Sequence, residues 1–188
     1  MRITGGMWRS RRLKGPRRGM AVRPTPDAMR ERAFAVLGDT VEDARVLDLF
    51  AGTGAVGLEA LSRGADSVVF VERDRAVARI LRENLESLNE DLGTILVRAA
   101  APVVLDLARR GQVFDLVWAD PPFDRWRLGL EVLEKAANAE ILEPTATLCL
   151  ECPADAKLPH AIGGCRLNRD LTGSASRVAI YRSHGSDF

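Results

Sequence analysis

The segment Val46-Leu47-Asp48-Leu49-Phe50-Ala51-Gly52-Thr53-Gly54-Ala55-Val56-Gly57 sets the architecture expected for this chain. It begins with a short apolar run, which predicts a buried strand, and its glycines follow the spacing G-x-G-x-x-G. Glu72 lies twenty residues beyond Gly52, at the end of the next apolar run. A strand, a glycine turn, a helix and a second strand that ends in an acid are typical of a nucleoside-binding unit. Glycines that serve only a tight turn are the alternative.

On both sides of this loop, short apolar runs alternate with amphipathic segments. Strands are expected over 45–50, 67–72, 94–98, 114–120, 146–151, 166–171 and 177–182, and helices over 28–37, 54–63, 75–88, 102–110 and 128–139. Strands that alternate with helices in this way run parallel and are joined by helical crossovers. The prediction is therefore a Rossmann-like, doubly wound α/β sheet that ends in an antiparallel strand pair.

Composition and length fit one globular domain. The 188 residues are 46% hydrophobic and 28% charged. No uncharged apolar run approaches the roughly 20 residues of a membrane-spanning helix. Residues 1–23 are basic but are followed by no apolar run, so a secretory signal is not expected. Three cysteines without such a signal favour a reducing compartment and no disulfide framework. A cytoplasmic protein is therefore predicted, with a monomer as the default.

The net charge of +1 hides a strong asymmetry along the chain. Residues 1–23 carry eight arginines and lysines and no acidic residue, whereas the remaining chain has 19 basic and 26 acidic residues. A purely basic arm on an acidic body is typical of contact with a polyanion. We expect residues 1–25 to form a basic, RNA-binding β-hairpin ahead of a catalytic domain over residues 26–188. A solvated basic tail without a partner is the alternative.

Asp48 indicates which nucleoside the glycine loop binds, because the glycine spacing alone also fits NAD. A carboxylate four residues before the first glycine would repel a pyrophosphate. It would attract the ammonium of a methionine moiety, and Glu72 could accept hydrogen bonds from ribose hydroxyls. The prediction is S-adenosylmethionine, with S-adenosylhomocysteine as product and no metal. After the third strand stand Ala99 and Ala100, so an adenine there would be held by backbone groups or packing.

A second motif, Asp120-Pro121-Pro122-Phe123, follows the fourth expected strand. Ligands of open α/β sheets bind beyond the carboxyl ends of the strands, so this motif should face the same crevice as Gly52. The Asp120 carboxylate and the Pro121 carbonyl could hold the two N–H groups of an exocyclic purine amine, while Phe123 stacks on the base. Methyl transfer then needs mainly in-line positioning. A Pro-Pro turn that only ends the strand is the alternative.

Smaller signals support simpler interpretations. Cys149 and Cys152, with His160 and Cys165 downstream, have a superficial likeness to a zinc set. Residues three apart in a strand point to opposite faces, so buried thiols are the preferred interpretation. Trp8 could stack on a base or fill a hairpin core, and Trp126 could line the base pocket or pack beneath the next helix.

Six pieces of sequence together resemble the RsmD family of 16S ribosomal RNA guanine-N2 methyltransferases over nearly the whole chain. They are Arg2-Ile3-Thr4-Gly5-Gly6, Leu13-Lys14, Arg23-Pro24-Thr25, Arg30-Glu31-Arg32-Ala33-Phe34, the segment from Asp48 to Gly57, and Asp120-Pro121-Pro122-Phe123. The resemblance implies a class I methyltransferase fold with a seven-stranded sheet and a small N-terminal β-hairpin. It also implies transfer of one methyl group to N2 of a single guanine, 966 in the usual 16S numbering, during small-subunit assembly.

The sequence patterns and the resemblance together predict the residues of each site, and the resemblance itself implies Asp48, Gly52, Gly54 and Glu72 at the cofactor and Asp120 to Phe123 at the guanine. The residues expected at the cofactor are Asp48, Phe50, Gly52, Thr53, Gly54, Glu72, Ala99 and Ala100. Those expected at the guanine, as the catalytic set, are Asp120, Pro121, Pro122 and Phe123. Those expected to contact RNA are Arg9, Arg11, Arg12, Lys14, Arg17, Arg18, Arg23 and Arg30.

Other functions remain open at this point. The same cofactor could serve N6 of adenine in DNA or a glutamine amide in a protein, although those families more often have Asn or Tyr in the second motif. An NAD-dependent oxidoreductase and a non-catalytic RNA-binding assembly factor are further alternatives. No obvious catalytic constellation of His, Lys or Tyr accompanies the glycine loop, as an oxidoreductase would require. The intact second motif argues against a non-catalytic assembly factor.

Overall fold

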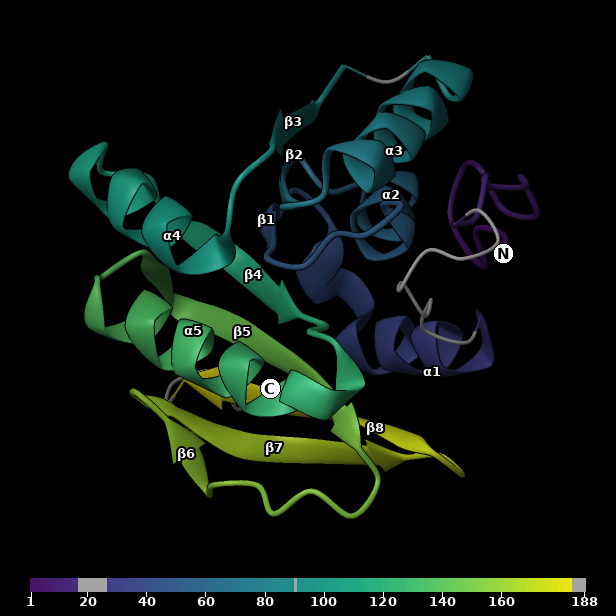
Figure 1. Ribbon diagram of the computed structural model, residues 1–188. Coiled ribbons are helices and arrows are strands. Elements are labelled where there is room, and N and C mark those ends of the chain that lie inside the picture. Colours follow the sequence, from purple (N-terminus) through teal and green to yellow (C-terminus); the bar gives the residue numbers. More distant parts are fainter. Residues whose placement is uncertain (17–26, 90, 184–188) are drawn as a thin grey trace.

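The computed structural model describes residues 1–16, 27–89 and 91–183 (Figure 1). The helices are α1 (Asp27–Leu37), α2 (Ala55–Ser62), α3 (Arg75–Ser87), α4 (Ala100–Arg109) and α5 (Trp126–Asn138), with 3-10 turns η1 (Gly38–Val41) and η2 (Phe123–Arg125). The strands are β1 (Arg45–Asp48), β2 (Ser67–Val71), β3 (Gly93–Leu96), β4 (Phe114–Ala119), β5 (Leu142–Pro153), β6 (Ala161–Ile162), β7 (Cys165–Thr172) and β8 (Ser176–Ser183). None of the helices described is long and apolar enough to cross a membrane.

The strands form one eight-stranded sheet in the order β3-β2-β1-β4-β5-β8-β7-β6. The first five strands in this order are parallel, and β8, β7 and β6 add antiparallel pairs. The predicted α/β fold is therefore confirmed. The expected count of seven strands is wrong, because the two-residue strand β6 pairs with β7 and adds an eighth.

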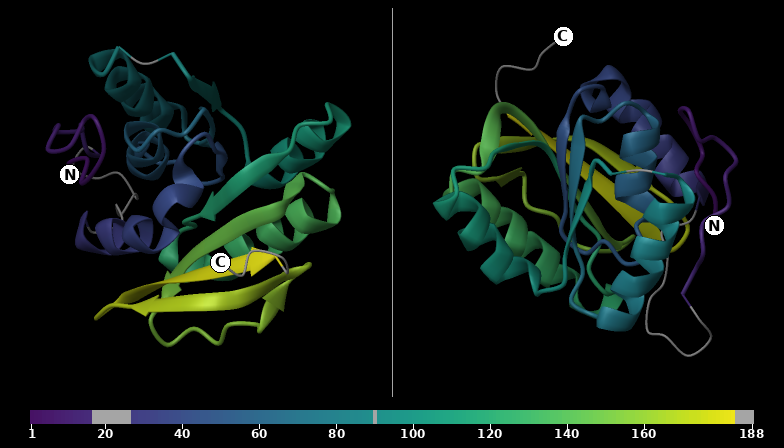
Figure 2. Two further views of the ribbon diagram at one scale, coloured as in Figure 1. Left: turned by 180° about the vertical axis from the view of Figure 1, so that it is seen from behind. Right: turned by 90° about the horizontal axis from the view of Figure 1, so that it is seen from above.

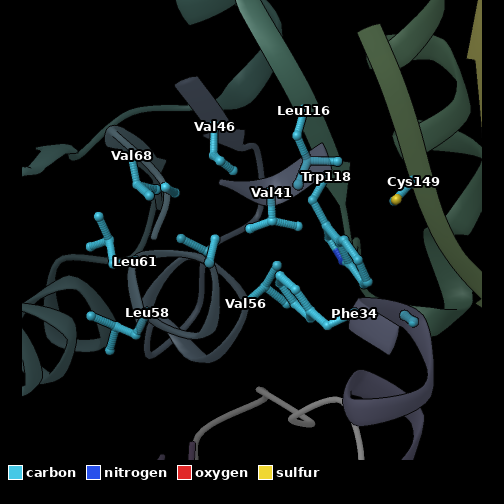
Figure 3. Close-up of a cluster of buried hydrophobic side chains, with 14 of the residues drawn as sticks. Phe34, Val41, Val46, Val56, Leu58, Leu61, Val68, Leu116, Trp118 and Cys149 are labelled. Atoms are coloured by element: carbon cyan, nitrogen blue, oxygen red, sulfur yellow. The ribbon is translucent and has the colours of Figure 1, made fainter. Parts of the chain in front are cut away.

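Helices cover both faces of the sheet and enclose two apolar cores. Helices α1, α2 and α3 lie on one face and α4 and α5 on the other, as the view from above shows (Figure 2). In the first core the rings of Phe34 and Trp118 stack with centroids 5.8 Å apart (Figure 3). Alternate residues of β4 serve opposite cores, since Trp118 belongs to the first and Val117 to the second.

The N-terminal segment folds back on itself. Ile3 N–H donates to the Arg11 carbonyl at 3.0 Å, Ser10 N–H donates to the Ile3 carbonyl at 2.9 Å, and Arg2 and Arg12 form a single antiparallel bridge. Ile3 and Leu13 are buried in the first core. The segment over residues 1–16 is thus a closed loop with one bridge instead of two regular strands. The expected boundary near residue 25 lies outside the described residues.

Candidate active site

The carboxyl ends of the parallel strands meet at a cavity of about 620 Å³. Most of the predicted cofactor and catalytic residues line it: Asp48, Phe50, Gly52, Thr53, Glu72, Ala99, Ala100, Asp120, Pro121, Pro122 and Phe123. Its volume lies within the range of sites that hold small ligands and cofactors. The structure therefore brings the glycine loop and the second motif together in one space.

The three glycines of the loop have different roles. Gly52 lines the cavity with a φ of 55°, and Gly54 precedes α2 with a φ of 90°, so both adopt the left-handed conformation that favours glycine. Gly54 is not in the cavity wall; a Cβ there would overlap the side chain of Leu81. A Cβ at Gly57 would overlap the Phe70 ring, so this glycine allows α2 to pack closely on β2.

Asp48 is a buried carboxylate at the end of β1. Its Oδ2 accepts a hydrogen bond from the Gly57 N–H at 3.1 Å. Burial raises the pKa of Asp48 to about 7, and this hydrogen bond opposes part of that shift. A negative charge here would be stabilised by a cationic ligand group, which would lower the pKa again.

Glu72 connects the end of β2 to the glycine loop. Its Oε2 accepts the Gly52 N–H at 3.0 Å and its Oε1 accepts the Asp74 N–H at 2.7 Å. Burial raises the pKa of Glu72, although these hydrogen bonds act in the opposite direction. The carboxylate thus orients the backbone of the cavity wall and also presents oxygens to a ligand that carries hydroxyl groups.

The protonation state of Asp48 predicts that ligand affinity depends on pH. If its carboxylate faces a ligand ammonium, affinity for S-adenosylhomocysteine should rise with pH through about 7, because below that pH binding must first remove a proton. The loss should approach tenfold per pH unit below 7. Asp48→Asn should bind more weakly and without this dependence. Calorimetric titrations at pH 6 to 8 measure it, with exposed Asp66→Asn as control. A wild-type affinity that is flat with pH would contradict this role.

The second motif leaves β4 directly into a short helical turn. Arg125 N–H donates to the Pro122 carbonyl at 2.8 Å, which closes η2, a turn that begins at Phe123, the last residue of the motif. Helix α5 lies close behind it, since a Cβ at Gly129 would approach Pro121 Cγ to 2.8 Å. Pro121 is buried, while Asp120 and Phe123 are half-buried in the cavity wall. The motif is thus held from behind and open toward the cavity.

The wall also contains residues that the sequence did not single out. They are mainly Arg73, Asp74, Asp124, Arg125, Leu128, Glu151, Ala175 and Ser176. Glu151 ends the apolar run of β5 next to β4. A carboxylate at the carboxyl end of a strand beside the second motif was the available signal, because strand ends of an open sheet face one crevice.

Part of the predicted RNA-contacting set lies on the N-terminal segment. Arg9, Arg11, Arg12 and Lys14 are exposed; Arg11 donates to the Ser87 carbonyl at 2.9 Å, and the Lys14 ammonium lies 2.9 Å from Glu83 Oε2. Arg17, Arg18 and Arg23 lie outside the described residues.

The structure contradicts the expectation that Arg30 contacts RNA, because its side chain is 0% exposed. Arg30 Nε lies 3.2 Å from Glu59 Oε2, and its Nη2 lies 3.0 Å from Asp27 Oδ1. Glu59, also 0% exposed, further accepts the Thr4 N–H at 2.8 Å and the Arg63 Nε–H at 2.9 Å. This carboxylate therefore joins the N-terminal segment, α1 and α2.

Asn84 of α3 forms a second anchor for the N-terminal segment. Its side-chain oxygen accepts the Lys14 N–H at 2.8 Å, and its amide nitrogen donates to the carbonyls of Lys14 and Thr53 at 3.1 and 2.9 Å. Thr53 lines the cavity. One buried side chain thus contacts both the basic segment and the glycine loop.

The cysteines and tryptophans noted in the sequence pack in or against the two apolar cores. Cys149 belongs to the first core and Cys152 to the second, so the expectation that they point to opposite faces of β5 is confirmed. Trp126 is buried in the second core, with the Arg127 guanidinium 4.8 Å from its ring, and Trp8 packs half-buried against the first core.

Comparison with known proteins adds independent information. A family model described as "Conserved hypothetical protein 95" matches residues 1–182. Ribosomal RNA small subunit methyltransferase D of Escherichia coli K12 is 35% identical over 182 residues, which cover 97% of this chain and 89% of that protein. The protein of the same name from Haemophilus influenzae is 32% identical over 181 residues, or 94% of this chain and 91% of its own length. The solved structure of Escherichia coli yhhF superposes with a TM-score of 0.84 at 34% identity and 97% coverage of both chains.

Proposed function

This chain belongs to the RsmD family, and from that membership we propose that it is an S-adenosylmethionine-dependent methyltransferase of 16S ribosomal RNA. Its product would be N2-methylguanosine at one position of the small ribosomal subunit or its assembly intermediate, which places its work in the cytoplasm. The observation that carries the proposal is the shared cavity, in which Asp48 and Glu72 lie together with Asp120 to Phe123.

The residues of the cavity fit the proposed cofactor. Asp48 is a buried acid whose raised pKa reports an environment that would favour a cationic partner. Glu72 presents carboxylate oxygens suited to ribose hydroxyls, and Ala99 and Ala100 leave room beside the start of α4. Asp48, close to the glycine loop, would repel a pyrophosphate, which disfavours a dinucleotide. S-adenosylmethionine, when bound, supplies an electrophilic methyl group on a sulfonium.

The second motif prepares the nucleophile. The lone pair of an exocyclic guanine amine is delocalised into the ring, so the amine is a weak nucleophile. The Asp120 carboxylate and the Pro121 carbonyl accept its two N–H groups and favour a tetrahedral nitrogen, while Phe123 stacks on the base. The methylated nitrogen carries a positive charge, and Asp120 or water takes its proton. Most of the catalysis is then positioning and charge stabilisation.

The test is transfer of labelled methyl groups from S-adenosylmethionine to small subunits that lack the modification, followed by nucleoside mass spectrometry. N2-methylguanosine at one site is the expected product. A methylated adenine or a methylated protein would identify another target for the same cofactor. Absence of cofactor binding would overturn the role of Asp48.

The exposed arginines of the N-terminal segment predict the salt dependence of RNA binding. Each phosphate contact contributes about 0.7–0.9 to the slope of log affinity against log salt. Changing Arg9 and Arg12 to Gln should therefore flatten the slope by about 1.4–1.8. Helix α4 lies on the far side of the molecule from the N-terminal segment in Figures 1 and 2, so Arg109→Gln at its end provides a control. Filter binding over a salt series measures both slopes. An unchanged slope in the double variant would contradict the proposal that the N-terminal segment contacts RNA.

A further inference from the structure

Glu151 is a buried acid in the wall of the cavity that none of the roles above uses. It belongs to β5, is 3% exposed, and lines the cavity together with Asp120, Pro121 and Ser176. Strand β5 pairs with β4 on one side and with β8 on the other, where Glu151 is opposite Val178. Its backbone is therefore held from both sides.

The strand register places Glu151 beside Asp120. The last paired residues of β4 and β5 are Ala119 and Leu150, so Asp120 and Glu151 are the next residue of each chain segment. Neighbouring strands lie ~4.8 Å apart. Cys149 belongs to the first core, and alternation along β5 directs Glu151 toward that same face, while Asp120 leaves β4 into the cavity wall. Two acids from neighbouring chain segments thus line the same part of the cavity.

A carboxyl group interrupts an apolar stretch of β5 at this position. The preceding residues of β5, Leu148, Cys149 and Leu150, are buried and apolar, and Cys152 follows in the second core. Glu151 lines the cavity together with the second motif, where the target base is proposed to bind. Because a carboxylate accepts hydrogen bonds, it is suited to an N–H group of that base.

The chemistry of the bases identifies that donor. Guanine is the base in which the exocyclic amine is next to a ring N–H, the N1–H. In adenine and cytosine the ring nitrogen next to the amine is an acceptor. A carboxylate beside Asp120 would accept from the guanine N1–H while Asp120 holds the amine. Against adenine or cytosine the same oxygen would face a lone pair, which is unfavourable.

We propose that Glu151 determines the base specificity of this methyltransferase by accepting a hydrogen bond from N1–H of the target guanine. The inference rests on the proposed function and deepens it, because it explains how one exocyclic amine is selected among three kinds. Glu151 is distinct in role from Asp120: it selects the base and Asp120 orients the reacting amine.

2-Aminopurine separates these two roles. It keeps the 2-amino group that would be methylated but has no hydrogen on N1. Small subunits are reconstituted with guanine or 2-aminopurine at the target position, and single-turnover methyl transfer is followed by nucleoside mass spectrometry. The wild-type protein should prefer guanine by roughly 10- to 100-fold, the contribution of a hydrogen bond to a charged group.

The variant Glu151→Gln tests the residue itself. A glutamine can donate its amide N–H to the unprotonated N1 of 2-aminopurine, so the preference for guanine should fall at least about tenfold. Glu143→Gln is the matched control: Glu143 lies at the other end of β5, where it pairs with Arg45, and its loss should leave the preference unchanged.

The outcomes are distinguishable. Equal rates of the wild-type protein on guanine and 2-aminopurine would overturn the proposal. This measurement needs no variant, so it decides the question even if Glu151→Gln folds poorly. A variant that loses rate on both bases in the same proportion would also overturn it, because that is the result of a structural role. Wild-type transfer to neither base, in subunits that the protein binds, would overturn the proposed function and the base preference with it.

Discussion

Asp120→Ala is expected to lower the rate of methyl transfer by at least about 100- to 1,000-fold, the usual cost of removing one preorganised group that stabilises developing charge. The amine becomes cationic as the methyl group arrives, and Asp120 is the acid of the second motif that faces it in the cavity. Binding of S-adenosylhomocysteine should change little, because the residues proposed to bind it are Asp48 and Glu72. Single-turnover rates and calorimetric titration measure the two effects separately.

Two further variants provide comparisons for the rate of Asp120→Ala. Asp120→Asn keeps one acceptor oxygen without the charge and should retain an intermediate rate. Asp115→Ala removes an acid of β4 that accepts a hydrogen bond from Arg45 and lies outside the cavity wall. This variant should retain the wild-type rate. Full activity of Asp120→Ala would refute the mechanism, and loss of cofactor binding in the same variant would show that Asp120 acts on the cofactor instead.

Glu59→Ala should have the largest effect on stability. Its carboxylate and the Arg30 guanidinium are both completely buried, so removing the acid leaves a buried cation with part of its compensation lost. Breaking such a pair costs roughly 3–5 kcal/mol, and the contact of Arg30 with Asp27 favours the lower end. The free energy of unfolding from urea titration should therefore fall by about 3 kcal/mol.

An exposed glutamate provides the comparison for Glu59. Glu131→Ala changes a solvent-exposed position of α5 and should stay within about 0.5 kcal/mol of the wild type. Glu59→Gln keeps the shape of the side chain and two of its hydrogen bonds. Its free energy of unfolding should lie between those of Glu59→Ala and Glu131→Ala. Equal stability of Glu59→Ala and the wild type would mean that the buried pair contributes nothing to the fold.

The parallel core was predictable because its signals are local. An apolar run, a glycine turn and an amphipathic helix recur along the chain, and each element of that kind was found within a few residues of its expected position. The bounds of two elements differ from the expected ones because tertiary contacts decide them. Helix α5 begins at Trp126, directly after η2, and β5 begins at Leu142, which pairs with Phe114 of β4, and ends at Pro153, which pairs with Ser176 of β8. Strand β6 was missed, since two residues carry no periodicity.

The candidate site was predictable to the extent that its residues follow strand ends. Asp48, Gly52, Glu72 and the second motif share one cavity for that reason. Arg30 was misjudged because a charged residue on a short helix is usually solvated, and its burial depends on Glu59, which lies 29 residues away. Glu151 was overlooked although its position at the end of an expected strand is visible in the sequence; the register of β4 and β5, which places it beside Asp120, is not encoded locally.

The anchoring of the N-terminal segment limits how this enzyme can be taken apart or recombined. Thr4, Trp8 and Lys14 are bonded to Glu59, Ser62 and Asn84 of the catalytic body, so the basic segment is a structural part of that body. A truncated protein would lose folding free energy as well as the proposed phosphate contacts, so a loss of RNA binding would not measure those contacts alone. A chimera that takes the segment from a relative would need matching acceptors on α2 and α3. Sequence change in this segment is thus tied to change in the helices beneath it.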